Sequence, residues 1–137
     1  MSRIDVTFAY GWNLDPESMR GAEPLCRAVL RDHRLTFRPF ACAEPCPGAS
    51  VQGALWRLPA EVERALDRRE GYPHLYGKEQ VEVEVKSGPP RLARGYVPHD
   101  ALAYEESAPY ASYLEVVRRG YRYWGLDESR LPKEEEE

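Results

Sequence analysis

The chain has 137 residues, of which 42% are hydrophobic and 31% charged, and its formal net charge is −4. This length supports one hydrophobic core, so we expect a single domain over residues 1–130 and a self-repelling, disordered acidic tail over residues 131–137. The acidic balance argues against nucleic-acid binding, and no apolar run is long enough to span a membrane, so we expect a soluble, cytoplasmic protein.

The cysteines fit a reducing compartment. The N-terminal residues lack the basic, apolar and small-residue succession of a signal peptide. We therefore expect Cys26, Cys42 and Cys46 to remain thiols, with no disulfide framework.

Much of the chain has the period-two alternation of half-buried strands. In chain order, strands are expected at residues 4–10, 34–40, 51–58, 80–85 and 92–97. The clearest alternation places Val81, Val83 and Val85 on one face and glutamates on the other. Two segments rich in Pro and Gly predict turns, at residues 44–49 and 87–90.

Helical spacing occurs twice. Residues 59–69 follow a helix-opening Pro59 with apolar side chains on one face, and residues 113–123 carry a similar stripe that ends before Gly125. Helices inserted among short strands predict an α+β fold, with a largely antiparallel or barrel-like sheet rather than a doubly wound one.

Glu70 is the first candidate for proton transfer. It lies where the first predicted helix gives way to Gly71, near unpaired backbone carbonyls and the negative end of the helix dipole. That environment disfavours the charged carboxylate and should raise its pKa, which suits a general base. The alternative is that Glu70 is one more solvated charge beside Arg68 and Arg69.

The second candidate is the segment that leads from the first strand through Gly11. Asp15 is a good N-cap and Pro16 fits the first helical position, so this segment predicts a strand-to-helix turn. Consecutive N–H groups in such a turn can bind a carboxylate or a developing oxyanion. The alternative is a turn that only connects two elements.

Other chemistry has less support in the sequence. Cys42 and Cys46 are close together, and His33 and His74 are present, but no second pair completes a zinc site, so no metal is expected. Nothing places a histidine beside a thiol, which argues against a Cys–His nucleophile. A set of aromatic residues near the second helix fits a core better than a pocket: Tyr110, Tyr113, Tyr121, Tyr123 and Trp124.

Four segments follow one another in the order seen in the γ-glutamylcyclotransferase family. They are residues 10–14 (Tyr-Gly-Trp-Asn-Leu), residues 51–56 (Val-Gln-Gly-Ala-Leu-Trp), residues 66–71 (Leu-Asp-Arg-Arg-Glu-Gly) followed by Tyr76, and residues 106–109 ahead of Tyr113 and Gly120. The chain resembles this family from its first strand to Leu126, including the avirulence-induced and γ-glutamylamine cyclotransferase branches. The resemblance implies a small, mostly antiparallel β-barrel with flanking helices. It also implies conversion of γ-glutamyl amines or amino acids to 5-oxoproline and free amine, without metal or other cofactor.

The resemblance further implies roles for particular residues. Glu70 matches the family's catalytic glutamate, and the substrate-binding positions match Tyr10, Gly11, Trp12, Asn13, Leu14, Tyr76 and Tyr113. Trp12 departs from the pattern, because the family usually has serine there. If the loop acts through backbone N–H groups, this change preserves the donors and alters only the volume nearby. If a hydroxyl is required, the change weakens the assignment.

Two hypotheses of function follow. The first is an enzyme that acts on a small γ-glutamyl substrate; the second is a non-catalytic module that binds a small carboxylate, with Trp12 filling the reaction space. Glu70 favours the enzyme, because a carboxylate facing an anionic ligand would weaken simple binding. We expect a monomer or small homo-oligomer. The enzyme hypothesis requires the named residues to converge on one concave pocket.

Overall fold

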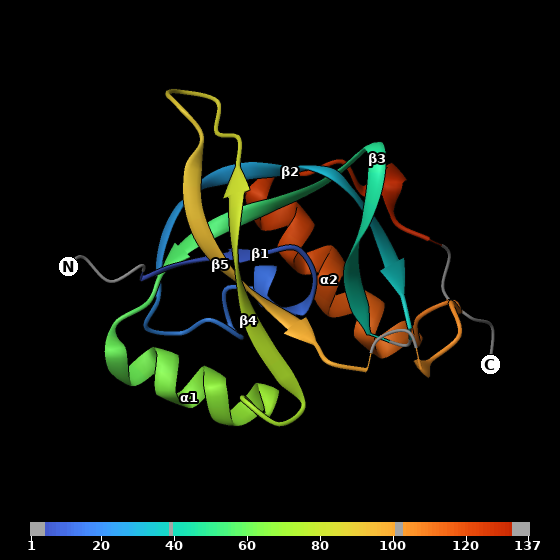
Figure 1. The fold of residues 1–137 in the computed structure, drawn as a ribbon, viewed down its shortest axis with the longest axis horizontal. Helices are drawn as coiled ribbons and strands as arrows, with labels where there is room; N and C mark the ends of the chain where they lie inside the picture. Colours follow the sequence, from blue (N-terminus) through green and yellow to red (C-terminus); the bar gives the residue numbers. More distant parts are fainter. Residues whose placement is uncertain (1–4, 39, 101–102, 133–137) are drawn as a thin grey trace.

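A strongly curved five-stranded sheet forms the body of the protein (Figure 1). The structure is a computed structural model that describes residues 5–38, 40–100 and 103–132. The strands are β1 (Val6–Ala9), β2 (Glu23–Phe37), β3 (Ala41–Arg57), β4 (Tyr76–Val83) and β5 (Arg91–Pro98). The helices are α1 (Ala60–Glu70) and α2 (Ala111–Trp124), and two 3₁₀ turns are η1 (Trp12–Leu14) and η3 (Glu128–Arg130).

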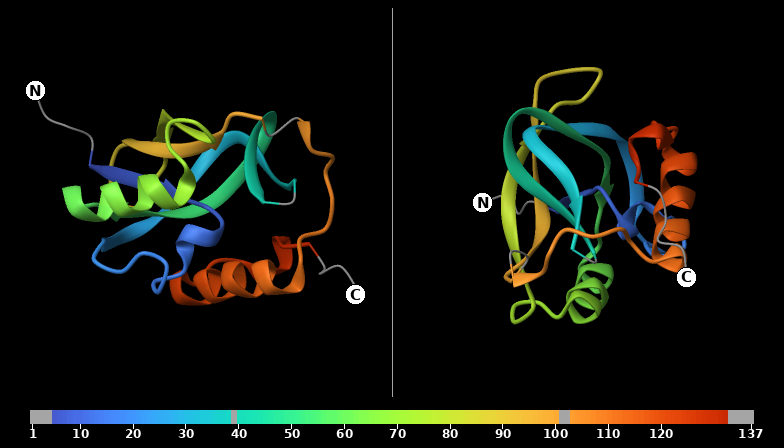
Figure 2. Two further views of the ribbon diagram at one scale, coloured as in Figure 1. Left: turned by 90° about the horizontal axis from the view of Figure 1, so that it is seen from below. Right: turned by 90° about the vertical axis from the view of Figure 1, so that its right-hand side faces the viewer.

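The strands are ordered β2-β3-β1-β5-β4 across the sheet. Strand β1 pairs in parallel with β5, and the other neighbouring strands are antiparallel. The helices lie apart from each other, α2 along one side of the sheet and α1 near the start of β4 (Figure 2). This arrangement confirms the predicted α+β class with a mostly antiparallel sheet.

The sheet is not closed into a barrel, so the barrel prediction is wrong. Its edge strands β2 and β4 approach at an isolated bridge between Val29 and Glu84, whose backbone N–H and C=O groups exchange two hydrogen bonds of 2.9 Å. A barrel requires a continuous ladder between the first and last strands. Here Glu84 already lies beyond the end of β4, so the two edges meet only where β4 has finished.

Strands β2 and β3 form one long hairpin, which corrects two predictions. Residues 34–40 are not a separate strand, because β2 begins at Glu23 and runs to Phe37. Residues 44–49 are not a turn between strands but part of β3, opposite a break in register between Arg31 and His33. Prolines are tolerated in this part of β3 because it pairs with β2 alone; β1 pairs with β3 only from Ala54 onward.

Helix α1 has the predicted signals at both ends. Pro59 is the residue before its first turn, and Gly71 ends it in the left-handed conformation with φ of 70°. The helix predicted to start at Pro16 is absent, because the segment after η1 forms successive turns instead. Asp15 does not cap a helix there; its buried carboxylate pairs with Arg119 of α2 at 2.8 Å.

The core has two parts. One lies where α2 and η1 pack against β3, and includes Leu14, Trp56, Val117 and Tyr121. The other fills the concave side of the sheet, and includes Phe8, Leu30, Val51, Leu55 and Val83. Within the described ranges, no helix has the length and apolar character needed to cross a membrane. The acidic residues 133–137 lie outside the described part of the chain.

Candidate active site

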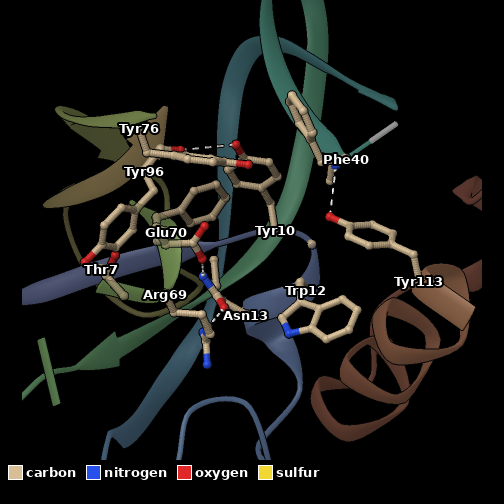
Figure 3. A pocket seen from close by; sticks show the side chains of 14 residues that line it. Thr7, Tyr10, Trp12, Asn13, Phe40, Arg69, Glu70, Tyr76, Tyr96 and Tyr113 are labelled. Atoms are coloured by element: carbon tan, nitrogen blue, oxygen red, sulfur yellow. Dashed lines mark hydrogen bonds between the residues drawn. The ribbon is translucent and has the colours of Figure 1, made fainter. Parts of the chain in front are cut away.

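A cavity of about 310 Å³ opens where β1 continues into η1, facing the end of α1 (Figure 3). Strands β4 and β5, the start of β3 and the first turn of α2 complete its walls. The lining residues are Thr7, Phe8, Ala9, Tyr10, Gly11, Trp12, Asn13, Phe40, Ala41, Arg69, Glu70, Tyr76, Tyr96 and Tyr113.

The structure brings together all but one of the residues that the sequence and the family resemblance proposed for the site. Tyr10, Gly11, Trp12, Asn13, Glu70, Tyr76 and Tyr113 line this one cavity. Leu14 does not, because its side chain is fully buried in the core beneath η1. The N–H of Leu14 is also occupied, since it donates to the Gly11 carbonyl at 3.1 Å.

Glu70 is the last residue of α1, and its carboxylate reaches the cavity (Figure 3). Gly71 fixes this position, because its left-handed conformation ends the helix directly after Glu70. The Glu70 Oε1 atom accepts a hydrogen bond of 3.1 Å from the side-chain amide of Asn13. The candidate base and the candidate anion-binding loop are therefore in direct contact.

Two indole groups donate hydrogen bonds to backbone carbonyls of the loop. Trp56 donates its Nε1–H to the Asn13 carbonyl at 2.9 Å, and Trp124 donates to the Leu14 carbonyl at 3.1 Å. Gly11 is required at the start of the loop, because a Cβ atom there would lie 2.7 Å from the Cβ of Ala41. At the start of such a turn, the first N–H groups have no carbonyl partner within the turn, which leaves Gly11, Trp12 and Asn13 as the possible donors. Of these, the Trp12 N–H already faces the Tyr113 hydroxyl.

Three tyrosine hydroxyls on the cavity wall are held in their neutral form. Burial raises the pKa of Tyr113 to about 12, although the Ala41 N–H, which donates to its oxygen at 3.0 Å, acts in the opposite direction. Burial, followed by the Glu70 carboxylate, raises the pKa of Tyr76, and burial raises that of Tyr10. At neutral pH these hydroxyls can orient a ligand by hydrogen bonding without adding charge.

Trp12 lies at the edge of the cavity. Its ring packs against Tyr113 with 5.3 Å between ring centroids, and it is 37% exposed. It is Asn13 and not Trp12 that contacts Glu70 (Figure 3). The indole therefore borders the cavity without separating the loop from the carboxylate.

The sequence reasoning missed the other residues that line the cavity, which are Thr7, Phe8, Ala9, Phe40, Ala41, Arg69 and Tyr96. Tyr96 was not marked by alternation, because Leu92 and Arg94 on its face of β5 are not buried, whereas the buried Ala93 lies on the other face. Its hydroxyl donates to Asp67 of α1, whose carboxylate also pairs with Lys78 at 2.8 Å. No sequence pattern indicated a role for Arg69, because arginines near a helix end are common on any protein surface.

Metal-ligating side chains do not gather in the described ranges: no group of three or more His, Cys, Asp or Glu residues there is placed to hold an ion. Cys26, Cys42 and Cys46 are free thiols. Burial raises the pKa of Cys42 to about 11, which keeps that thiol protonated and poorly nucleophilic.

These features define a class of protein: a small α+β domain with one glutamate and a loop of backbone donors in an aromatic cavity. A family model described as gamma-glutamyl cyclotransferase, AIG2-like, matches residues 7–115. Gamma-glutamylcyclotransferase from Mus musculus is 29% identical, with 95% of this chain and 74% of the mouse protein covered. The Homo sapiens gamma-glutamylcyclotransferase is 27% identical, with 87% and 71% covered.

Solved structures agree with the sequence comparison. A gamma-glutamyl cyclotransferase structure matches with a TM-score of 0.81 at 25% identity, covering 93% of this chain and 85% of that one. An AIG2-like protein from Mus musculus matches with a TM-score of 0.62 at 19% identity, covering 81% and 90%, and shows a likeness of fold. The chain belongs to the gamma-glutamyl cyclotransferase, AIG2-like family.

Proposed function

We propose that the protein is a cyclotransferase that releases 5-oxoproline from a γ-glutamyl amine or γ-glutamyl amino acid. The observation that carries this proposal is the contact between Glu70 and Asn13 of the η1 loop inside one cavity. It pairs a proton carrier with a set of backbone donors, which are the two groups the reaction needs. The names of the relatives support the same reaction class.

The substrate carries its own nucleophile. The α-amine of a γ-glutamyl amide can attack the γ-carbonyl and close an unstrained five-membered ring. Such an intramolecular attack has an effective molarity worth up to roughly 7–11 kcal/mol of barrier. The protein therefore needs to supply proton transfer and charge stabilisation, but no covalent nucleophile, metal or nucleotide.

Glu70 would act as base and then as acid. Its carboxylate accepts a proton from the substrate's α-ammonium, and the freed amine attacks the γ-carbonyl carbon. As the tetrahedral intermediate collapses, Glu70 returns that proton to the leaving nitrogen and the C–N bond breaks. The ring nitrogen sheds a second proton, which ends on the freed amine, so the products are 5-oxoproline and an ammonium ion.

The loop would bind negative charge. N–H groups of Gly11, Trp12 and Asn13 are the candidates for holding the substrate's α-carboxylate or the oxyanion of the intermediate. Tyr76 and Tyr113 would orient the substrate through their neutral hydroxyls. Free thiols at all three cysteines are consistent with a cytoplasmic location, which we include in the proposal.

The test is incubation with a panel of γ-glutamyl amino acids and γ-glutamyl amines, followed by measurement of 5-oxoproline. We expect release from at least one compound, and a loss on the order of a hundredfold to ten-thousandfold in the Glu70→Gln variant. The matched control is Glu61→Gln, which removes an exposed carboxylate from the other end of the same helix. Full activity in Glu70→Gln would remove Glu70 from the mechanism. Binding of 5-oxoproline without turnover of any compound would favour the non-catalytic module instead.

A further inference from the structure

The side chain of Arg69 joins two parts of the segment that connects β1 to β2. Its Nη1 donates to the backbone carbonyl of Ser18 at 2.7 Å, and its Nη2 donates to the side-chain Oδ1 of Asn13 at 2.5 Å. Both ends of the guanidinium are therefore held, although the residue lies on the exposed side of α1. A planar group with two fixed partners loses its rotational freedom and can set the position of each partner.

These contacts fix the orientation of the Asn13 amide. Oδ1 accepts from Arg69, and Nδ2 donates to Glu70 Oε1. The reverse orientation would place the amide oxygen against a carboxylate oxygen and the amide nitrogen against a guanidinium, which are both repulsive contacts. Without Arg69, only the contact with Glu70 would hold the Asn13 amide in this orientation.

We infer that Arg69 is a positioning residue for the catalytic carboxylate and acts through Asn13; this inference rests on the proposed function. Arg69 holds the Asn13 amide so that it occupies Oε1 of Glu70, which leaves Oε2 to exchange the proton with the substrate.

The surroundings of Glu70 make Arg69 distinctive. The groups that face Glu70 from the other elements are the Asn13 amide of η1 and the tyrosines of β4, β5 and α2, namely Tyr76, Tyr96 and Tyr113. Among the described residues that line the cavity, Arg69 is the only cation. Asp67 and Lys78 do not line the cavity. They form an ion pair of 2.8 Å, and the Asp67 carboxylate also accepts a hydrogen bond from the Tyr96 hydroxyl, which does line it.

The kinetic test uses Arg69→Gln, with Arg68→Gln as a matched control that removes a neighbouring exposed charge from the same helix. Loss of a hydrogen bond to a charged group predicts a fall in kcat of roughly ten- to a hundredfold for Arg69→Gln. Arg69→Lys, which can reach one partner at a time, should give an intermediate result.

A double-mutant cycle separates positioning from a direct effect of charge. In an Asn13→Ala background, we expect Arg69→Gln to lower kcat no further, because its partner is already gone. A fall in kcat that persists at full size in this background would overturn the inference. Equal effects of Arg68→Gln and Arg69→Gln would overturn it as well.

A measurement on the free protein tests the inference independently of turnover. The side-chain amide resonances of Asn13 should show a restrained, hydrogen-bonded group in the wild type and in Arg68→Gln, and an averaged group in Arg69→Gln. Unchanged Asn13 amide resonances in Arg69→Gln would overturn the inference even if activity fell. If no γ-glutamyl compound is turned over, the proposed function fails, while the amide resonances still decide the role of Arg69.

Discussion

Trp12 shows at the scale of a single residue how the cavity differs from the family pattern. The family resemblance implies serine at this position, whereas here an indole packs on Tyr113 and stays 37% exposed at the cavity edge. If the loop acts through its backbone N–H groups, this exchange preserves the donors and alters only the size of the site. If a hydroxyl is required, the exchange removes it.

Trp12→Ser should widen the range of leaving amines without destroying catalysis. We expect KM to fall for substrates with bulky amines and kcat to change little, because the indole borders the cavity and does not touch Glu70. Loss of the ring contact with Tyr113 should lower the free energy of unfolding by about 1 kcal/mol. Steady-state kinetics on amines of increasing size checks the first part. An inert protein that becomes active on Trp12→Ser would support the non-catalytic module instead.

Some site residues were predictable from the sequence and others were not. Glu70 was found because a helix stop at Gly71 marks its position, and the loop was found because Gly11 follows a strand. Arg69 could not be found, because its role depends on the distance between a helix end and a loop more than fifty residues earlier. Leu14 was assigned to the site by resemblance, but its side chain belongs to the core.

At the scale of elements, α1 and α2 each end at a glycine in the left-handed backbone conformation, so the same substitution can be compared at both helix ends. Gly71 and Gly125 have φ values of 70° and 71°, which an alanine adopts only with strain. Gly71→Ala and Gly125→Ala should each lower the free energy of unfolding by roughly 1–2 kcal/mol. Only Gly71→Ala should also lower activity, because Glu70 is the residue directly before it.

Chemical denaturation and 5-oxoproline release, measured on both variants, check this prediction. A Cβ at Gly71 would meet a Leu75 side-chain atom at 2.8 Å, so the turn after Glu70 must shift, whereas at Gly125 the nearest atom lies 3.7 Å away. Equal loss of activity in the two variants would show that the end of α1 does not set the geometry of the base.

Sequence periodicity located β5, both helices and the second half of β4, which begins at Tyr76 and ends at Val83 rather than spanning residues 80–85. It failed for β2 and β3, because prolines and Gly48 interrupt the pattern within β3 and were interpreted as a turn. Whether a proline is tolerated in a strand depends on which neighbours need its missing N–H. That information lies in the pairing of strands, which local sequence does not contain.

At the scale of the whole molecule, buried tyrosines make stability sensitive to alkaline pH. The pKa values of Tyr10, Tyr76, Tyr96 and Tyr113 are all raised from an ordinary value of 10.0, with burial as the first cause. Above that pH the unfolded chain loses protons that the folded chain keeps. Stability should therefore be unaffected by these groups below pH 10.0 and fall as the pH rises above it, by up to about 1.4 kcal/mol per pH unit for each tyrosine.

Denaturant midpoints measured across this alkaline range, together with tyrosinate absorbance, check the prediction. Tyr113→Phe removes one of five such groups, since burial also raises the pKa of Tyr121, and should make the decline shallower. Ionisation of the buried tyrosines before the protein unfolds would contradict it, since the folded state would then not be holding their protons.

The indoles that hold the η1 loop give the protein a built-in optical probe. The chain contains three tryptophans, and each one is part of this loop or bonded to it: Trp12 within it, Trp56 on the Asn13 carbonyl and Trp124 on the Leu14 carbonyl. Intrinsic fluorescence therefore reports almost entirely on the loop that faces Glu70. Ligand binding can be followed by titration without any label, and a change in emission would register at the candidate active site rather than averaged over the molecule.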